Sequence, residues 1–198
     1  MRPVTIDGTL DRRQAVAAFL KDRGDLLLVT GLGSSSYDAH AAGDHDANYY
    51  LWGAMGAAAL IGLGIAQARP ERTVLVITGD GEQLMGLGGL ATIAVAKPSN
   101  LVILVVDNGH FGETGMQKSH TGHGIEIAKV AQACGIEARL AYDLAEVEAM
   151  RRSLRRRANG PRLYVVKVRP ENPPRSLPPR DAVHLKNRFR THLGLPIT

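Results

Sequence analysis

Runs of branched aliphatic residues, each ending in a polar or glycine-containing turn, most constrain how this chain can fold. Three of them read DLLLVTG (25–31), RTVLVITGDG (72–81) and NLVILVVDNG (100–109). Strands that are this uniformly apolar are usually covered on both faces, which is typical of parallel sheets. Segments with helical spacing of apolar residues separate the runs. We therefore predict an α/β fold of three layers, in which a doubly wound parallel sheet lies between two layers of helices.

Other segments continue the alternation of strand and helix. We predict helices at 10–24, 53–69, 83–96, 124–135 and 144–157, further strands at 137–141 and 161–170, and a polar loop at 33–50. Gly24 and Pro70 are helix-terminating residues at or just after the ends of the first two helices. A proline-rich strap is expected at about 170–198, with a short helix in its last part.

Length and charge limit the class of protein. The chain has 198 residues, enough to bury one sizeable core, so we expect a single domain over 1–198. Its net charge is +5, and much of this charge lies in MRRSLRRR (150–157) and in the C-terminal segment. Stacking aromatic residues and a known DNA-binding motif are missing beside these basic segments, so no nucleic-acid partner is expected. A solvated helix face or a subunit contact is the expected role of the basic residues.

Cysteine content and hydropathy bear on location. The single cysteine, Cys134, excludes an intrachain disulfide and a metal or iron–sulfur site made of four cysteines of this chain. The longest apolar stretch, LWGAMGAAALIGLGIA (51–66), is short for a bilayer span and predicts a buried helix. The N-terminal segment lacks the apolar core of a signal peptide. We expect a cytoplasmic protein without a membrane partner.

Polar residues at three strand ends carry the functional prediction. Ligands of open parallel sheets bind beyond the carboxyl ends of the strands, where Thr30-Gly31, Gly79-Asp80-Gly81 and Asp107-Asn108-Gly109 fall. Glycines allow the backbone to approach a ligand, and the N–H groups of the following helix can hold a phosphate. A carboxylate beside a phosphate needs a cation between them, and Mg²⁺ prefers oxygen ligands. We predict a Mg²⁺ site formed by Asp80, Asn108 and the backbone carbonyl of His110.

The spacing of these residues resembles a known motif. Gly-Asp-Gly, 25 residues and then Asp-Asn is similar to the GDG…NN motif of thiamine-diphosphate-dependent enzymes, with Asp107 in place of the first asparagine. NYYLWGAMGAAALIGLGIA (48–66) looks like the segment before GDG in thiamine-diphosphate decarboxylases. DNGHFGETGMQ (107–117) resembles a region of sulfopyruvate and phosphonopyruvate decarboxylases. The resemblance extends over 25–194 and implies the thiamine-diphosphate-binding fold.

The resemblance also implies a set of cofactor contacts. Met55 would support the thiazolium ring, and the carbonyl of Gly53 and the N–H of Met55 would contact the aminopyrimidine. Glu82 is expected to turn its side chain outward, because an inward carboxylate would repel the diphosphate, and to leave its N–H for the ligand. The implied cofactor-binding residues are Thr30, Gly31, Gly53, Ala54, Met55, Gly79, Asp80, Gly81, Glu82, Asn108, His110 and Phe111.

A partner subunit follows from the part of the family that this chain resembles. In those enzymes one domain binds the diphosphate, and another binds the aminopyrimidine and supplies an activating glutamate. The chain resembles the diphosphate-binding half alone. The implied protein is the β-type subunit of a thiamine-diphosphate- and Mg²⁺-dependent 2-oxoacid decarboxylase, a carboxy-lyase acting on a small 2-oxoacid. Its expected partner is a pyrimidine-binding α-type subunit, in a heterodimer or an α2β2 tetramer.

Histidines near the second motif are candidates for catalysis. His110 or His120 is predicted to contact the substrate carboxylate or to transfer a proton. A zinc site made of His110, His120 and His123 would need a fold that the glycine-rich loop does not specify. A histidine of the segment His40–Asp46 is a further candidate, with simple solvent exposure as the alternative.

Residues of two other loops are open to more than one interpretation. Thr114 and Gln117 either line the substrate entrance or support their loop. Ser34–Ser36 follow a glycine-containing turn and could bind phosphate through a backbone nest. The sequence around them, GLGSSS (31–36), lacks the third glycine of a dinucleotide-binding fingerprint.

Several other functions remain open at this point. An acetolactate-synthase-like carboligase would use the same cofactor site. The β subunit of a 2-oxoacid:ferredoxin oxidoreductase is disfavoured by the missing cluster cysteines. A nucleotide-binding oxidoreductase would require the absent fingerprint, and a non-catalytic partner subunit would not need Asp80, Asn108, Gly53 and Met55 intact.

Overall fold

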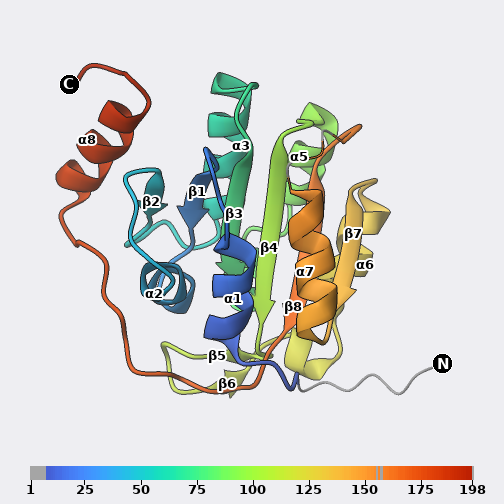
Figure 1. Cartoon of the computed structure of the whole chain (residues 1–198). Helices are drawn as coiled ribbons and strands as arrows, with labels where there is room; N and C mark the ends of the chain where they lie inside the picture. Colours follow the sequence, from blue (N-terminus) through green and yellow to red (C-terminus); the bar gives the residue numbers. More distant parts are fainter. Residues whose placement is uncertain (1–7, 155, 157, 198) are drawn as a thin grey trace.

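A computed structural model of the chain describes residues 8–154, 156 and 158–197. At its centre lies a six-stranded sheet with the strand order β2-β1-β3-β4-β8-β7, and each neighbouring pair is parallel (Figure 1). The strands of this sheet are β1 (Leu27–Thr30), β2 (Asn48–Tyr50), β3 (Val74–Gly79), β4 (Leu101–Asp107), β7 (Glu137–Ala141) and β8 (Arg162–Lys167).

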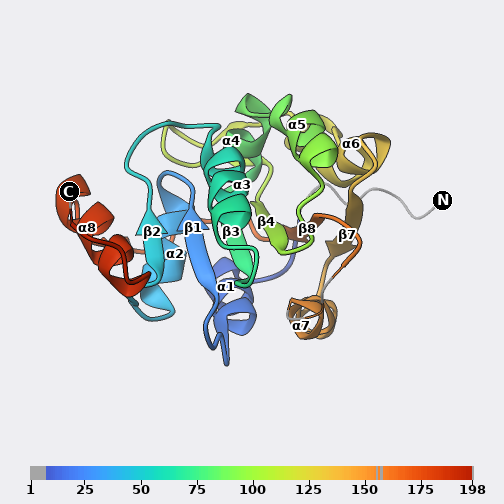
Figure 2. The ribbon, with the colours of Figure 1, turned by 90° about the horizontal axis from the view of Figure 1, so that it is seen from above.

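Helices cover both faces of the sheet, as Figure 2 shows from above. One face carries α1 (Arg12–Leu20), α2 (Ser34–Ala41) and α7 (Leu144–Ser153), and the other carries α3 (Ala58–Ala68), α4 (Asp80–Met85), α5 (Gly89–Ala96) and α6 (Ile127–Ala133). The last helix, α8 (Ala182–His192), packs beside the edge strand β2. The predicted doubly wound, three-layer α/β fold is confirmed.

Alternation along the central strand β4 fills both halves of the core. Leu101, Ile103 and Val105 join the core under α3, α5 and α6, and the residues between them join the core under α1 and α7. All seven residues of β4 are buried. Fully burying one such side chain contributes about 1.5–3 kcal/mol. This explains why the strand sequence shows continuous rather than alternating hydrophobicity.

The predicted loop at 33–50 was the largest error of the sequence analysis. It contains the helix α2 and the parallel edge strand β2. The helix escaped prediction because its sequence, SSSYDAHA, has no stripe of large apolar residues. Small and polar side chains, such as Ser35, Ser36 and Ala39, form its buried face instead.

Helix boundaries also differ from the prediction. The helix predicted at 53–69 begins at Ala58, because the preceding turn has positive φ at Ala54 and Gly56. The helix predicted at 83–96 is broken into α4 and α5. A Cβ at Gly86 would lie 2.0 Å from the Gly56 carbonyl oxygen, so only glycine permits this close approach of the two turns.

Further differences concern α7 and the segment after β4. Helix α7 ends at Ser153, and Arg155 and Arg157 of the predicted helix lie outside the described residues. After β4, a hairpin of β5 (His110–Phe111) and β6 (Gln117–Lys118) precedes the 3₁₀ turn η1 (Thr121–His123). None of the described helices is long and apolar enough to cross a membrane.

The C-terminal strap, defined here as residues 170–181, passes from β8 along the β5–β6 hairpin to α8 (Figure 1). Asn172 donates a hydrogen bond to the Gly112 carbonyl, and Arg175 pairs with Glu113. Further along, Trp52 Nε1 donates to the Pro179 carbonyl at 2.7 Å. These contacts attach the strap to the β5–β6 hairpin and to the turn that contains Trp52.

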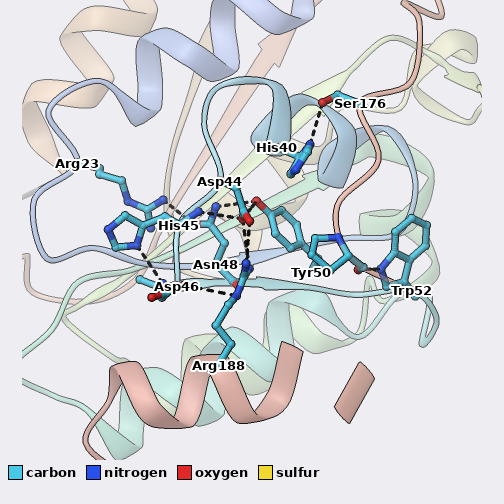
Figure 3. A network of polar contacts seen from close by, with 12 residues as sticks. Arg23, His40, Asp44, His45, Asp46, Asn48, Tyr50, Trp52, Ser176 and Arg188 are labelled. Atoms are coloured by element: carbon cyan, nitrogen blue, oxygen red, sulfur yellow. Dashed lines mark hydrogen bonds and ion pairs between the residues drawn. The ribbon is translucent and has the colours of Figure 1, made fainter. Parts of the chain in front are cut away.

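A polar network holds α8 against β2 (Figure 3). Arg188 forms an ion pair with Asp44 at 2.7 Å and donates to the Asn48 carbonyl. Burial alone would raise the pKa of Asp44, but hydrogen bonds from Arg188 and Tyr50 outweigh burial and lower this pKa below its usual value. His40 lies in the same view, bonded to Ser176 of the strap. The edge strand β2 is therefore covered rather than open.

Two glycines of α3 provide a test of this packing. A Cβ at Gly62 would lie 2.2 Å from Val76 Cγ2, whereas a Cβ at Gly64 would meet nothing within 4 Å. We expect Gly62→Ala to destabilise the fold by about 1–3 kcal/mol through overpacking. Gly64→Ala should be neutral or stabilise it by up to about 1 kcal/mol, since alanine favours helix. Urea unfolding measures both, and equal effects would contradict the close contact of α3 with β3.

Candidate functional site

A cavity of about 160 Å³ lies beyond the carboxyl ends of the central strands. The register of the sheet pairs Gly79 of β3 with Val106 of β4, so the two polar turns leave the sheet side by side. The cavity is lined by Arg12, Leu32, Ser34, Ser35, Met55, Gly79, Asp80, Gly81, Glu82, Val106, Asn108, His110, Phe111, Gly112, Glu113 and Thr114. Two of the three predicted strand ends therefore contribute side chains to one cavity.

Asp80 is the buried acid of this cavity, with 2% of its surface exposed. Its Oδ2 accepts hydrogen bonds from the hydroxyls of Ser119 and, at 3.0 Å, Thr121. Oδ1 has no side-chain partner among the residues that the structure describes. Burial raises the pKa of Asp80, the nearby charge of Asp107 raises it further, and the two hydroxyl groups oppose the rise. The free oxygen suits a cationic ligand.

Asn108 lines the cavity beside Asp80. Its Oδ1 accepts a hydrogen bond from the backbone N–H of His110 at 3.0 Å, which fixes the side chain as in an Asx turn. An amide oxygen has a second lone pair, so a further partner remains possible. The His110 ring lies against the same turn, with Nδ1 2.8 Å from the Asn108 carbonyl oxygen.

Phe111 explains the second glycine of the Gly-Asp-Gly turn. A Cβ at Gly81 would lie 2.6 Å from the Phe111 ring. The ring therefore packs directly on the backbone at the start of α4. Only glycine at position 81 allows the β5–β6 hairpin to close over this end of the cavity.

Asp107, the departure from the family motif, does not line the cavity. It is 2% exposed, and its Oδ2 pairs with Lys167 Nζ of β8 at 2.6 Å. Its Oδ1 accepts from Thr121 Oγ1 at 2.7 Å and from the backbone N–H of Gly109. The Thr121 hydroxyl has a single hydrogen, so it can donate to Asp80 or to Asp107 but not to both at once.

The expected orientation of Glu82 was wrong. Its side chain turns inward, is 4% exposed and accepts a hydrogen bond from Thr78 Oγ1 at 3.0 Å. A Cβ at Gly31 would lie 1.6 Å from Glu82 Oε2, so the glycine makes room for this carboxyl group. Burial raises the pKa of Glu82, while Thr78 and nearby backbone N–H groups oppose the rise. The Glu82 carboxyl group is thus buried against the β1–α2 turn, and the raised pKa lessens the charge that would repel a diphosphate.

Some predicted cofactor residues do not line the cavity. Thr30 is fully buried and bonds the Ser36 hydroxyl at 2.7 Å, and Gly31 lies behind Glu82. Gly53 and Ala54 are exposed in the turn before Met55, which lines the cavity with 40% of its surface exposed. The binding roles of these residues stay predictions.

The candidate catalytic histidines separate into two groups. His110 lines the cavity, whereas His120 is exposed and its ring forms a T-shaped contact with the Phe111 ring. His40 and His45 belong to the region that the strap and α8 cover. Within the described ranges, no group of three or more His, Cys, Asp or Glu side chains could hold a metal ion.

Of the candidate residues in the two loops, some line the cavity and others support their loops. Thr114 lines the cavity, and Gln117 donates a hydrogen bond to its carbonyl oxygen. Ser34 and Ser35 line the cavity at the start of α2, and Ser36 instead bonds Thr30 and the Gly31 carbonyl.

Sequence reasoning missed Arg12, Ser119, Thr121 and Lys167. Arg12 lies on the same face of α1 as Ala15 and Val16, which follow it at helical spacing, and all three residues are buried. An arginine at an apolar-stripe position of a helix was a signal for a buried charge, and it was not used. Ser119, Thr121 and Lys167 had no such signal, because their roles depend on contacts between distant segments.

An open parallel sheet with an acid and an amide at adjoining strand ends is the arrangement of α/β proteins that bind a phosphorylated ligand. Residues 31–168 match the family model "Thiamine pyrophosphate enzyme, C-terminal TPP binding domain". The match covers more than half of the chain, which therefore belongs to this family. The resemblance to thiamine-diphosphate enzymes seen in the sequence is confirmed.

Curated relatives include short and long chains. The chain is 34% identical to the sulfopyruvate decarboxylase subunit beta of Methanothermobacter thermautotrophicus, over 91% of this chain and 94% of the relative. It is 38% identical to the same subunit of Methanocaldococcus jannaschii, over 62% and 64%. The phosphonopyruvate decarboxylase of Streptomyces viridochromogenes is 44% identical, over 58% of this chain and 28% of its own length.

These alignments span less than two thirds of several of the relatives, including the M. jannaschii subunit. Among solved structures, the thiamine diphosphate-dependent 4-hydroxybenzoylformate decarboxylase of Rhodococcus jostii RHA1 superposes with a TM-score of 0.68. It is 20% identical, over 85% of this chain and 34% of that one. This likeness supports the fold.

The pair of Asp107 and Lys167 gives a test of the site. We expect Lys167→Met to destabilise the fold by about 3–5 kcal/mol, because it leaves Asp107 buried without its cation. Adding Asp107→Asn should recover most of this loss, since an amide needs no counter-charge. Urea unfolding of the two single variants and the double variant measures the coupling. Additive effects would contradict a direct pairing.

Proposed function

We propose that this chain is the diphosphate-binding, β-type subunit of a two-subunit 2-oxoacid decarboxylase that depends on thiamine diphosphate and Mg²⁺. One observation carries the proposal: Asp80 and Asn108 line the same cavity at the strand ends of a thiamine-pyrophosphate-binding fold. The 34% identity to a sulfopyruvate decarboxylase subunit beta over nearly its whole length supports the β-type assignment. Sulfopyruvate- or phosphonopyruvate-like acids are the proposed substrates.

The residues present fit the proposed metal and cofactor. Asp80 offers an oxygen without a side-chain partner in the described chain, and Asn108 lines the same cavity. With the carbonyl of His110, they form an all-oxygen donor set suited to Mg²⁺. Gly79 would leave the backbone open to the diphosphate, since a Cβ there would meet nothing within 4 Å, and Met55 at the cavity mouth would support the thiazolium ring.

The cofactor, when bound, would supply the nucleophilic carbon and the electron sink for decarboxylation. The chain's own residues would orient it and exclude water, which Leu32, Val106 and Phe111 do on the apolar walls of the cavity. His110 Nδ1 must carry the proton of its bond to the Asn108 carbonyl, because a carbonyl only accepts. The Nε2 atom of neutral His110 is then a proton acceptor, the role that we propose for it.

A partner subunit is proposed because the chain matches the thiamine-pyrophosphate-binding domain, and each acid that lines its cavity has another role. Asp80 is the proposed metal ligand, Glu82 is bonded to Thr78, and Glu113 is paired with Arg175. We therefore assign the activation of the aminopyrimidine ring to none of them. The proposed pyrimidine-binding α-type subunit would supply that glutamate, in a heterodimer or an α2β2 tetramer.

An apolar surface marks where this partner would bind. We call it the α3–α5 surface, formed by Met55, Leu60, Met85 and Val95, which are 40%, 40%, 65% and 89% exposed. Met55 lines the cavity, and the other three residues lie on α3, α4 and α5, which cover the same face of the sheet (Figure 2). Large exposed apolar patches mark interaction sites. A partner seated here would reach the open side of the cavity.

Cofactor binding provides the direct test. We expect thiamine diphosphate with Mg²⁺ to stabilise the chain by about 2.7 kcal/mol at a hundredfold excess over Kd. Asp80→Ala should abolish the metal-dependent part, because it removes the charged ligand. Asp46→Ala, an exposed aspartate outside the cavity, is the control. Thermal unfolding with and without EDTA measures the effect. Unchanged cofactor affinity in Asp80→Ala would contradict the assignment of Asp80 as a metal ligand.

The partner proposal has its own test. The isolated chain should show little decarboxylation, and addition of the α-type subunit should restore turnover. Val95→Glu should weaken this association by tenfold or more, because it places a charge in the apolar interface, about 1.4 kcal/mol for each tenfold. Val183→Glu, at an exposed valine of α8, should not. Titration calorimetry measures both, and full activity of the isolated chain would refute the need for a partner.

A further inference from the structure

Two buried hydroxyl groups hold one oxygen of Asp80, the proposed metal ligand. Ser119 and Thr121 have 1% and 2% of their surfaces exposed. Both lie in hydrogen-bond contact with Asp80 Oδ2, Thr121 at 3.0 Å, and the two hydroxyl oxygens are 3.0 Å apart. In the described part of the chain, Asp80 Oδ1 receives no side-chain donor. Because Asp80 lines the cavity, the two hydroxyl groups leave one carboxylate oxygen for a ligand there.

The same segment also holds the turn of the second proposed ligand, Asn108. The backbone N–H of Ser119 donates to the Gly109 carbonyl oxygen at 2.8 Å. Gly109 has φ of 68°, and a Cβ at Gly122 would lie 2.4 Å from the Gly109 carbonyl oxygen. Glycine on both sides therefore allows the two turns to touch. Residues 119–122 thus contact both strand ends that carry proposed ligands, one through side chains and the other through backbone.

Thr121 also bridges the two buried acids. Its Oγ1 lies 2.7 Å from Asp107 Oδ1 and 3.0 Å from Asp80 Oδ2, and its single hydrogen can serve only one of them at a time. The shorter distance favours the bond to Asp107, whose other oxygen pairs with Lys167. Ser119 is then the main side-chain donor to Asp80, and Thr121 keeps the two carboxylates apart at a fixed separation.

Asp80 needs such support if it is to bind a metal. The terminal torsion of an aspartate is broad, so rotamer preference alone does not choose which oxygen faces a ligand. Mg²⁺ demands near-ideal octahedral geometry. Hydrogen bonds orient a ligating carboxylate, and loss of such a partner typically costs about 10–100-fold in metal affinity.

We propose that Ser119 and Thr121 are positioning residues for the metal. They hold Asp80 Oδ2, so that Oδ1 is presented to the cation, and their segment fixes the Asn108 turn beside it. The two hydroxyl groups act through Asp80 rather than as ligands. The inference rests on the proposed function for the identity of this cation as the Mg²⁺ of the cofactor.

Mn²⁺, titrated at a fixed excess of thiamine diphosphate, is the probe. Its electron paramagnetic resonance signal reports the ion bound to the chain, after subtraction of a titration without protein. We expect Ser119→Ala and Thr121→Val each to weaken Mn²⁺ binding to the full chain by about tenfold or more. Thr121→Ser should stay within about threefold of the unchanged chain, because it restores the hydroxyl group.

Ser153→Ala is the matched control. It removes a half-buried hydroxyl group that bonds Tyr164 and lies outside the cavity lining. It tests whether loss of any internal hydroxyl group weakens the metal site through general destabilisation. We expect it to change the Mn²⁺ affinity by less than about twofold.

Crystal structures without metal give a second measurement that does not depend on the cofactor. In the double variant Ser119→Ala/Thr121→Val, the Asp80 side chain should adopt a different terminal torsion, or more than one, because Oδ2 has lost both donors. The backbone at Asn108 should stay in place. If the double variant does not fold, the two single variants serve in the same way.

The positioning role is overturned if Ser119→Ala and Thr121→Val bind Mn²⁺ as the unchanged chain does, or if Asp80 keeps its orientation in crystals that lack these hydroxyl groups. A reoriented Asp80 in those crystals, together with an unchanged chain that binds no Mn²⁺ in the presence of thiamine diphosphate, would support the hold on Asp80 and refute the proposed cofactor.

Discussion

Two buried carboxylates at the ends of adjacent strands are the constraint on which the site depends. Asp80 and Asp107 are each 2% exposed, and the charge of Asp107 adds to burial in raising the pKa of Asp80. The two acids have different partners. Lys167 of β8 forms an ion pair with Asp107, whereas the side-chain donors to Asp80 among the described residues are the hydroxyls of Ser119 and Thr121. Asp80 is thus left with a charge that a divalent cation can balance, and in our account the cofactor's metal does so.

The sheet register, the β5–β6 hairpin and the strap hold these two strand ends in place. The sheet register sets the two turns side by side, and the β5–β6 hairpin closes one end with Phe111 against Gly81. The strap ties the hairpin, α2 and Trp52 together from outside. The opposite side, over α3 and α5, is left apolar and exposed. One side of the cavity is closed by the hairpin and the strap, and the other borders an exposed apolar surface. This arrangement agrees with the proposed role as one of two subunits.

The sequence predicted what depends on local pattern. Continuous apolar runs gave β3, β4 and the parallel sheet, and the Gly-Asp-Gly spacing located the turn that lines the cavity. It failed where tertiary contact decides the outcome. Helix α2 buries serines and alanine, which no hydropathy pattern reveals. Glu82 turns inward because Gly31, which is distant in the sequence, leaves space for its carboxyl group. The partner of Asp107 comes from β8, far along the chain, and could not be inferred from the motif.

A crystal structure of the chain with thiamine diphosphate and Mn²⁺, as a stand-in for Mg²⁺, tests the central claim most directly. The account predicts one anomalous-scattering peak within about 2.3 Å of both Asp80 Oδ1 and Asn108 Oδ1, with the diphosphate completing the coordination. A metal bound elsewhere, or a diphosphate held in the cavity while Asp80 and Asn108 make no contact with a metal, would contradict it.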